Sequence, residues 1–191
     1  MEQDAATKIR TFICIALPDA VTDYLAALQD KLKRFGGVRW VAPENIHLTL
    51  KFLGDVAPDK IDAITSSLRT ACADIVPFTL SLTGTGAFPN FHRPRVFWVG
   101  VEEEGGMLLR LYHRVEEELG RQFAEQERPF SPHLTLGRSK FDHGLQEVSA
   151  ALQQEKCPPL NFVARELIAM QSELLPQGAL YTPLAIVPFK M

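Results

Sequence analysis

Two copies of one tetrapeptide carry the residues best suited to chemistry. His47-Leu48-Thr49-Leu50 recurs 86 residues later as His133-Leu134-Thr135-Leu136, close to half the length of this 191-residue chain. Side chains alternate across a strand, so the histidine and the threonine of each copy share one face and the two leucines share the other. The leucines can pack on a core while imidazole and hydroxyl line a cleft.

This repeated pair predicts a site at which two histidines handle the protons of phosphodiester chemistry. Imidazole has a reference pKa of about 6.5, so one ring can act as general base while another acts as general acid. Phosphodiester cleavage requires both, because one proton leaves the attacking water and another reaches the departing oxygen. The hydroxyls of Thr49 and Thr135 can hold the non-bridging oxygens. We therefore expect His47 and His133 to act together, without a metal ion.

Other chemistries find little support in the sequence. It contains no His-Glu-x-x-His segment and no cysteine cluster, so we predict no metal site. Gly84-Thr85-Gly86 lacks the third glycine of a dinucleotide loop, and no Gly-Lys-Ser/Thr segment is present for a phosphate loop. We therefore expect no cofactor. Cys14, Cys72 and Cys157 are odd in number and widely spaced, which indicates reduced thiols.

The charge and the apolar pattern restrict the partners. A net charge of −3 and a pI near 6.0 offer no basic surface for a long polyanion. Any nucleic-acid substrate must therefore be bound through contacts at one local site. Residues 1–10 are polar, and no apolar stretch approaches the length of a membrane span. We expect a cytoplasmic protein without membrane contact. No heptad pattern appears, and we predict a monomer without an obligate protein partner.

The chain alternates strand-like and helix-like segments. Apolar and β-branched runs predict strands at 11–17, 38–41, 46–53 (ended by Gly54), 78–85, 96–101, 132–136, 160–170 and 180–187. Apolar residues at helical spacing predict helices within 21–32, 61–72, 108–119 and 145–152. Several connections are too short for a crossover helix, which favours an α+β fold with antiparallel pairing. No linker divides the chain, and the repeated motif indicates a duplicated architecture.

The paired motifs at 47–50 and 133–136 resemble the 2H phosphoesterase superfamily. The closer resemblance is to the RNA 2′,3′-cyclic phosphodiesterase family, also called 2′-5′ RNA ligases. Further matching stretches are Arg10-Thr11-Phe12, the run 40–54, Phe88-Pro89, the segment 94–100 and Gly137-Arg138. The resemblance covers nearly the whole chain.

This resemblance implies a single domain, 1–191, made of two pseudo-symmetric lobes with one motif in each. Antiparallel sheets would face a central cleft, with the helices outside. It also implies hydrolysis of a terminal 2′,3′-cyclic phosphate to a 2′-phosphate, on RNA ends or small nucleotides. His47 would be the proton donor to the leaving 3′-oxygen, and His133 the proton acceptor that activates water. The reverse reaction would join a 2′,3′-cyclic end to a 5′-hydroxyl.

Three residues just beyond the motifs are weaker candidates for substrate binding. Phe52 and Arg138 each lie five residues after a motif histidine, and strict alternation puts them on the leucine face, away from the cleft. A bulge permitted by Gly137 would turn Arg138 toward phosphate or base, and Phe52 would offer a stacking surface. Otherwise Phe52 is a core residue and Arg138 a surface charge. Lys51 shares the His47 face by parity and would add positive potential.

Two alternatives stay open on the sequence alone. A catalytically idle module could keep the cleft to bind RNA ends or nucleotides, although the presence of both histidines and both threonines favours chemistry. A 2H phosphoesterase could also act on another diester, such as a 2′-5′ oligonucleotide or a cyclic ADP-ribose derivative. Base preference and the balance of hydrolysis against ligation have no signal in the sequence.

Overall fold

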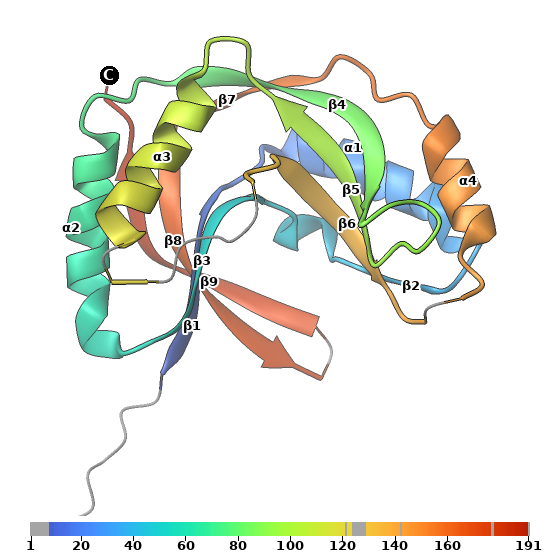
Figure 1. The fold of residues 1–191 in the computed structure, drawn as a ribbon, viewed down its shortest axis with the longest axis horizontal. Coiled ribbons are helices and arrows are strands. Elements are labelled where there is room, and N and C mark those ends of the chain that lie inside the picture. The colour runs from blue at the N-terminus through green and yellow to red at the C-terminus, as the bar shows by residue number, and fades with distance from the viewer. Residues whose placement is uncertain (1–7, 121, 124–128, 142, 177, 191) are drawn as a thin grey trace, which may run out of the picture.

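The computed structural model describes residues 8–120, 122–123, 129–141, 143–176 and 178–190. In these residues, nine strands make one curved sheet that is flanked by four α-helices (Figure 1). The strands are β1 (Ile9–Ile15), β2 (Val38–Trp40), β3 (Leu48–Val56), β4 (Phe78–Phe88), β5 (Val96–Glu102), β6 (His133–Ser139), β7 (Asn161–Ala164), β8 (Glu166–Leu175) and β9 (Gly178–Pro188). The helices are α1 (Asp19–Lys33), α2 (Ile61–Cys72), α3 (Met107–Gly120) and α4 (Gln146–Gln154), and η1 (Pro43–Asn45) and η2 (Pro58–Lys60) are single 3₁₀ turns.

The two motif-bearing strands lie side by side at the centre of the sheet. Its order is β7-β4-β5-β6-β3-β1-β8-β9, with β2 added to β6, and every pairing is antiparallel. β3 and β6 meet where Leu48 stands opposite Leu134, the second residue of each motif. The neighbours on the two sides correspond, β1 to β5 and β8 to β4. The predicted α+β fold with antiparallel pairing is confirmed, and its two halves form one continuous sheet.

The sheet curls until its two halves approach each other. β7 pairs with β4 at one edge, whereas β8 pairs with β1 in the other half. Only Arg165 separates β7 from β8 along the chain, so these distant positions of the sheet must lie close in space. The sequence predicted one strand over 160–170, because an apolar run does not reveal the corner within it.

The helices form two pairs, and their apolar stripes cover the outer face of the sheet. α2 packs with α3, and α1 lies beside α4 (Figure 1). α1 buries Val21, Leu25, Leu28 and Leu32, the four residues whose spacing predicted it. The motif leucines are fully buried beneath the helices, as alternation requires.

Each half of the chain contributes a helix that supports the motif strand of the other half. α1 follows β1, yet Gln29 Nε2 on α1 donates to the carbonyl of Leu136 in β6 at 2.8 Å. α3 follows β5, yet Glu116 on α3 pairs with Lys51 in β3. The two halves therefore interlock behind the central strands.

Several strand ends differ from the prediction, and two of them shape the cleft side of the sheet. β3 continues through Gly54 to Val56, because Gly54 adopts a φ of 71° within the strand rather than ending it. β8 extends to Leu175 and pairs with β9 along its whole length, so the hairpin turns only at Pro176. The resulting long hairpin projects from the body of the molecule (Figure 1).

Candidate active site

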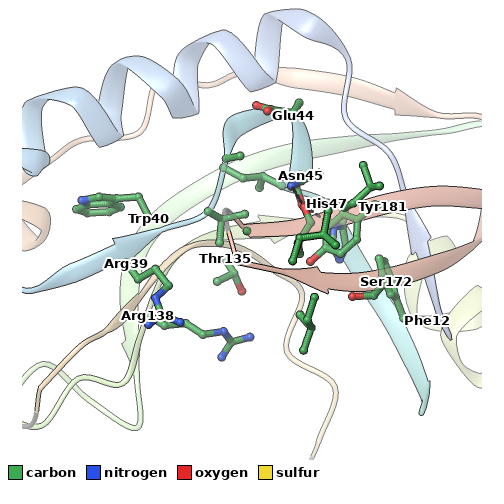
Figure 2. A pocket seen from close by; sticks show the side chains of 18 of the residues that line it. Phe12, Arg39, Trp40, Glu44, Asn45, His47, Thr135, Arg138, Ser172 and Tyr181 are labelled. Atoms are coloured by element: carbon green, nitrogen blue, oxygen red, sulfur yellow. Dashed lines mark hydrogen bonds between the residues drawn. The ribbon is translucent and has the colours of Figure 1, made fainter. Parts of the chain in front are cut away.

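The motif side chains converge at the centre of the sheet. His47 immediately precedes β3, and His133 is the first residue of β6. Because Leu48 stands opposite Leu134 in antiparallel register, position 47 faces position 135 and position 49 faces position 133. Each histidine therefore lies across from the threonine of the other motif. His47, Thr49 and Thr135 line one cleft, and His133 lies beside them. Figure 2 shows His47 and Thr135 in this cleft.

Both imidazoles are held by the same local hydrogen bond. His47 Nδ1 lies 2.8 Å from the carbonyl oxygen of Asn45, and His133 Nδ1 lies 2.6 Å from the carbonyl oxygen of Ser131. A carbonyl oxygen can only accept, so Nδ1 carries the hydrogen in each ring. Nε2 is therefore the nitrogen that can exchange a proton.

Asn45 also connects His47 to the projecting hairpin. Its side-chain amide donates to the carbonyl oxygen of Ala179 in β9 at 2.7 Å, while its own carbonyl accepts from His47. The η1 turn thus fixes the ring and the wall of the cleft together. The residue pattern gave no sign of this connection, because it joins residues far apart in the chain.

Two aromatic rings enclose the imidazole of His47. Phe12 on β1 stacks on it with ring centroids 4.5 Å apart and planes at 20°. Tyr181 on β9 meets it edge-on at 5.3 Å and 77° (Figure 2). Neither ring was predicted to act at the site, although Phe12 lies in a stretch that carried the family resemblance.

His133 has an aromatic surrounding of the same kind. Phe88 meets its ring edge-on at 4.9 Å and 84°, and the Trp98 indole lies 6.3 Å away. Phe88 and Trp98 come from β4 and β5, the counterparts of β8 and β1. Strand pairing decides these contacts, and the spacing of the residues in the chain gives no sign of them.

Burial between aromatic rings makes both histidines weak bases in the free protein. It lowers the pKa of His47 to about 4, an effect that the Asn45 carbonyl partly opposes and that charge on His133 strengthens. Burial also lowers the pKa of His133, and the nearby guanidinium of Arg138 adds to the effect, while the Ser131 carbonyl opposes it. Both rings are therefore mainly neutral at pH 7. A ring that donates a proton must first take one up, and a bound anion favours this uptake by raising the pKa of the ring.

We expect a bound phosphate to raise the pKa of His47. An anion beside the ring stabilises the imidazolium, so the pKa should move up from about 4 toward the ordinary value of about 6.5. Histidine ring resonances followed by NMR across pH 3–8, with and without inorganic phosphate, will measure this change. Potassium chloride at matched ionic strength is the control. An unchanged or lower pKa in phosphate would contradict the assignment of His47 to an anion site.

A bulge at the last leucine of each motif redirects the residues that follow. Thr49 pairs with Cys14 but Lys51 with Ile13, so Leu50 is skipped in the β1–β3 ladder. In the same way Leu136 is skipped in the β5–β6 ladder, between Thr135 and Gly137. The repeated motif thus carries a repeated bulge.

The bulges turn Phe52 and Arg138 toward the cleft. Both line it, and Phe52 is 56% exposed. Strict alternation would have put both side chains on the face of the leucines. The skipped residues Leu50 and Leu136 place them on the cleft face instead. Gly137 has another reason to be glycine: a Cβ there would lie 2.6 Å from Val38 Cγ1 and 3.0 Å from the Arg39 carbonyl oxygen. Gly137 allows β2 to pair closely with β6.

The same bulge makes the placement expected for Lys51 wrong. Its side chain is fully buried behind the sheet, where Nζ lies 2.7 Å from Glu116 Oε2. Parity puts Lys51 with His47 only if alternation continues past Leu50, and it does not. Lys51 does not line the cleft.

Gly86 provides the space in which Trp98 reaches His133. Gly86 is paired with Trp98 across β4 and β5, and a Cβ on it would overlap the indole ring. Gly84, two residues earlier in the same strand, has open space at that position. The contact explains why one of two nearby glycines matters for the site.

We expect Gly86→Ala to destabilise the protein by about 1–3 kcal/mol, because the indole must move out of a packed position. Gly84→Ala is the matched control and should change the free energy of unfolding by less than about 1 kcal/mol. Urea denaturation of both variants measures the difference. Equal effects of the two substitutions would contradict the packing role of Gly86.

The cleft is cationic although the chain as a whole is acidic. Its lining includes the basic residues Arg10, Lys33, Arg39, Arg138 and Lys140 and the acidic residues Glu44 and Asp55. This excess of positive charge favours an anionic ligand. Within the described part of the chain, no group of three or more histidine, cysteine or acidic residues is arranged to hold a metal, and no helix is long and apolar enough to cross a bilayer.

A family model described as LigT like phosphoesterase matches the chain twice, at residues 15–98 and 99–181. The chain belongs to this family of LigT-like phosphoesterases. Each match contains one motif, in agreement with the internal duplication. The LigT-like chain is an enzyme of the phosphoesterase class, and its helices and curled antiparallel sheet are those of the family fold.

Curated relatives and solved structures agree with this family. RNA 2′,3′-cyclic phosphodiesterase of Methanothermobacter thermautotrophicus is 34% identical over 183 residues, which cover 94% of this chain and 98% of the relative. The enzyme of the same name from Thermotoga maritima is 34% identical over 174 residues, 91% of each chain. The crystal structure of TT0787 of Thermus thermophilus has a TM-score of 0.75 at 31% identity, covering 95% and 98% of the chains. That of E. coli LigT complexed with 3′-AMP has a TM-score of 0.76 at 26% identity, covering 96% and 99%.

Proposed function

We propose that this LigT-like phosphoesterase hydrolyses terminal 2′,3′-cyclic phosphates of RNA to 2′-phosphates, using His47 and His133 as acid and base. The observation that carries the proposal is the central register: Leu48 opposite Leu134 sets two imidazoles, each tethered through Nδ1, beside the hydroxyl of the opposite motif. Relatives covering nearly the whole chain bear the name RNA 2′,3′-cyclic phosphodiesterase.

In this mechanism Nε2 of His133 accepts a proton from water as the water oxygen attacks phosphorus. The bond between phosphorus and the 3′-oxygen breaks, and His47 delivers its Nε2 proton to that oxygen. Thr49 and Thr135 donate hydrogen bonds to the non-bridging oxygens. A proton then passes from His133 to solvent and another returns to His47, so each cycle consumes one water.

The electrostatics support this use of His47 as the acid. A ring with a pKa of about 4 holds little charge at pH 7 in the free protein. The negative charge of the bound phosphate raises that pKa, so His47 takes up from solvent the proton that the leaving oxygen needs. Arg138, exposed at the cleft, places a positive charge near the bound phosphate and lowers the pKa of the base His133. Attack by a 5′-hydroxyl on phosphorus of a cyclic end would give the 2′-5′ ligation product.

The test is incubation of the protein with a 2′,3′-cyclic nucleotide or a short RNA carrying that end, in excess EDTA. We expect turnover in EDTA and only the 2′-phosphate as product, identified by chromatography against both monophosphates. A 3′-phosphate product would contradict the roles of acid and base, and inhibition by EDTA would contradict the metal-independent mechanism. Tight binding of a 2′-phosphorylated nucleotide without turnover would identify a binding module instead. Cytoplasmic location and a monomeric state stay predictions.

A further inference from the structure

At one end of the cleft two arginines stand directly opposite each other. Arg39 on β2 is the cross-strand partner of Arg138 on β6, and both side chains are exposed and line the cleft (Figure 2). Like charges at directly opposed positions of a sheet repel and destabilise the pairing. Among the residues that the structure describes, neither guanidinium has a carboxylate within 4.0 Å. Lys140, two residues past Arg138, adds a third positive charge at the same end.

At the opposite end of the cleft, a basic residue faces an acidic one. Arg10 on β1 stands across from Asp55 on β3, a pair of opposite charge. Lys33, a further basic residue of the lining, pairs with Asp30 at 2.6 Å. The excess positive charge of the cleft is therefore concentrated around Arg39 and Arg138.

The register places these two ends on opposite sides of the motif. β3 and β6 are antiparallel and meet at Leu48 and Leu134, so from that point they run in opposite directions. β3 leads toward Asp55 and Arg10, whereas β6 leads through Thr135 to Arg138 and Arg39. An anion that extends from the motif site therefore meets an excess of basic over acidic residues in only one of these directions.

We propose that Arg39, next to Arg138, binds the phosphate on the 5′ side of the terminal nucleoside, so that the RNA strand leaves the cleft along β2. This inference rests on the proposed function, which places the cyclic phosphate between the motifs. A planar guanidinium binds phosphate oxygens through two parallel hydrogen bonds, and a second phosphate would offset the repulsion of the opposed pair. The preferred substrate is then an RNA end of at least two nucleotides, or a mononucleotide with a 5′-phosphate.

Three substrates separate phosphate recognition from base recognition. They are a nucleoside 2′,3′-cyclic phosphate, the same compound with a 5′-phosphate, and a dinucleotide with a 2′,3′-cyclic end. In the wild type we expect kcat/KM to rise about tenfold from the first to the second, with the third similar to the second. In Arg39→Gln this ratio should fall to near one. Arg10→Gln, which changes an exposed cleft arginine that faces Asp55 across the strands, is the matched control and should keep the wild-type ratio.

Binding gives a readout independent of turnover. Calorimetric titration with a dinucleotide ending in a 2′-phosphate should show weaker binding to Arg39→Gln. The dependence of Kd on salt concentration should also become weaker, because one screened ion contact is lost. Arg10→Gln should keep the wild-type salt dependence.

The outcomes distinguish this proposal from the proposed function. If no cyclic substrate is hydrolysed, both fail. If hydrolysis occurs but the 5′-phosphate gives no gain, or the gain requires a second base, the phosphate site is wrong and the proposed function stands. Loss of the gain in Arg10→Gln rather than Arg39→Gln would overturn the direction of the strand and with it the proposal.

Discussion

Replacing either His47 or His133 with asparagine is expected to lower kcat/KM for a 2′,3′-cyclic nucleotide by about 10²–10⁴-fold. The asparagine amide can still donate to the carbonyl that now holds Nδ1, at Asn45 or Ser131. It has no group at the place of Nε2, so proton transfer is removed while the local tether is kept. Steady-state kinetics with both single variants measures the loss.

The two histidines should also behave as a unit. Because acid and base act in the same step, the double variant should lose much less than the product of the two single losses. His113, exposed on α3 and outside the cleft, supplies the control variant His113→Asn, which should keep wild-type turnover. Thermal unfolding of all variants checks that the fold is retained. A folded single variant with near-wild-type kcat/KM would refute the mechanism.

Lys51→Met is expected to lower the free energy of unfolding by about 3–5 kcal/mol. Lys51 is fully buried, and its partner Glu116 has a side chain only 15% exposed. Glu116 Oε1 already lacks a hydrogen-bond partner among the described residues, so the variant would leave a buried carboxylate without its cation. Urea denaturation will measure the loss.

A second substitution separates the charge effect from lost packing. Lys51→Met combined with Glu116→Leu removes both charges and should recover most of the lost stability, because apolar side chains can replace a buried ion pair. Lys31→Met is the matched control: Lys31 pairs with Glu155 at 3.3 Å, but its side chain is 63% exposed, so its loss should be below about 1 kcal/mol. Equal losses in Lys51→Met and Lys31→Met would show that burial does not matter at this pair.

Residue patterns predicted the elements well where periodicity and burial coincide. α1 buries the four residues that the 3.6-residue period selects, and the paired motifs fall at the start of the two central strands. The corner at Arg165 and the passage of β3 through Gly54 were not predicted, since both depend on which strands become neighbours. Lys51 was assigned to the wrong face for a related reason: skipping Leu50 reverses the alternation of the residues that come directly after it.

The sequence by itself determined the chemistry that is available: two imidazoles and two hydroxyls in duplicated strands, on an α+β chain with leucines to anchor them. The tertiary structure alone decided that these groups meet, because Leu48 and Leu134 are paired across 86 residues of chain. It also decided which aromatic rings lower the histidine pKa values and where the positive charge gathers. These properties arise from contacts between strands that are distant in the sequence, and strand periodicity carries no information about such partners.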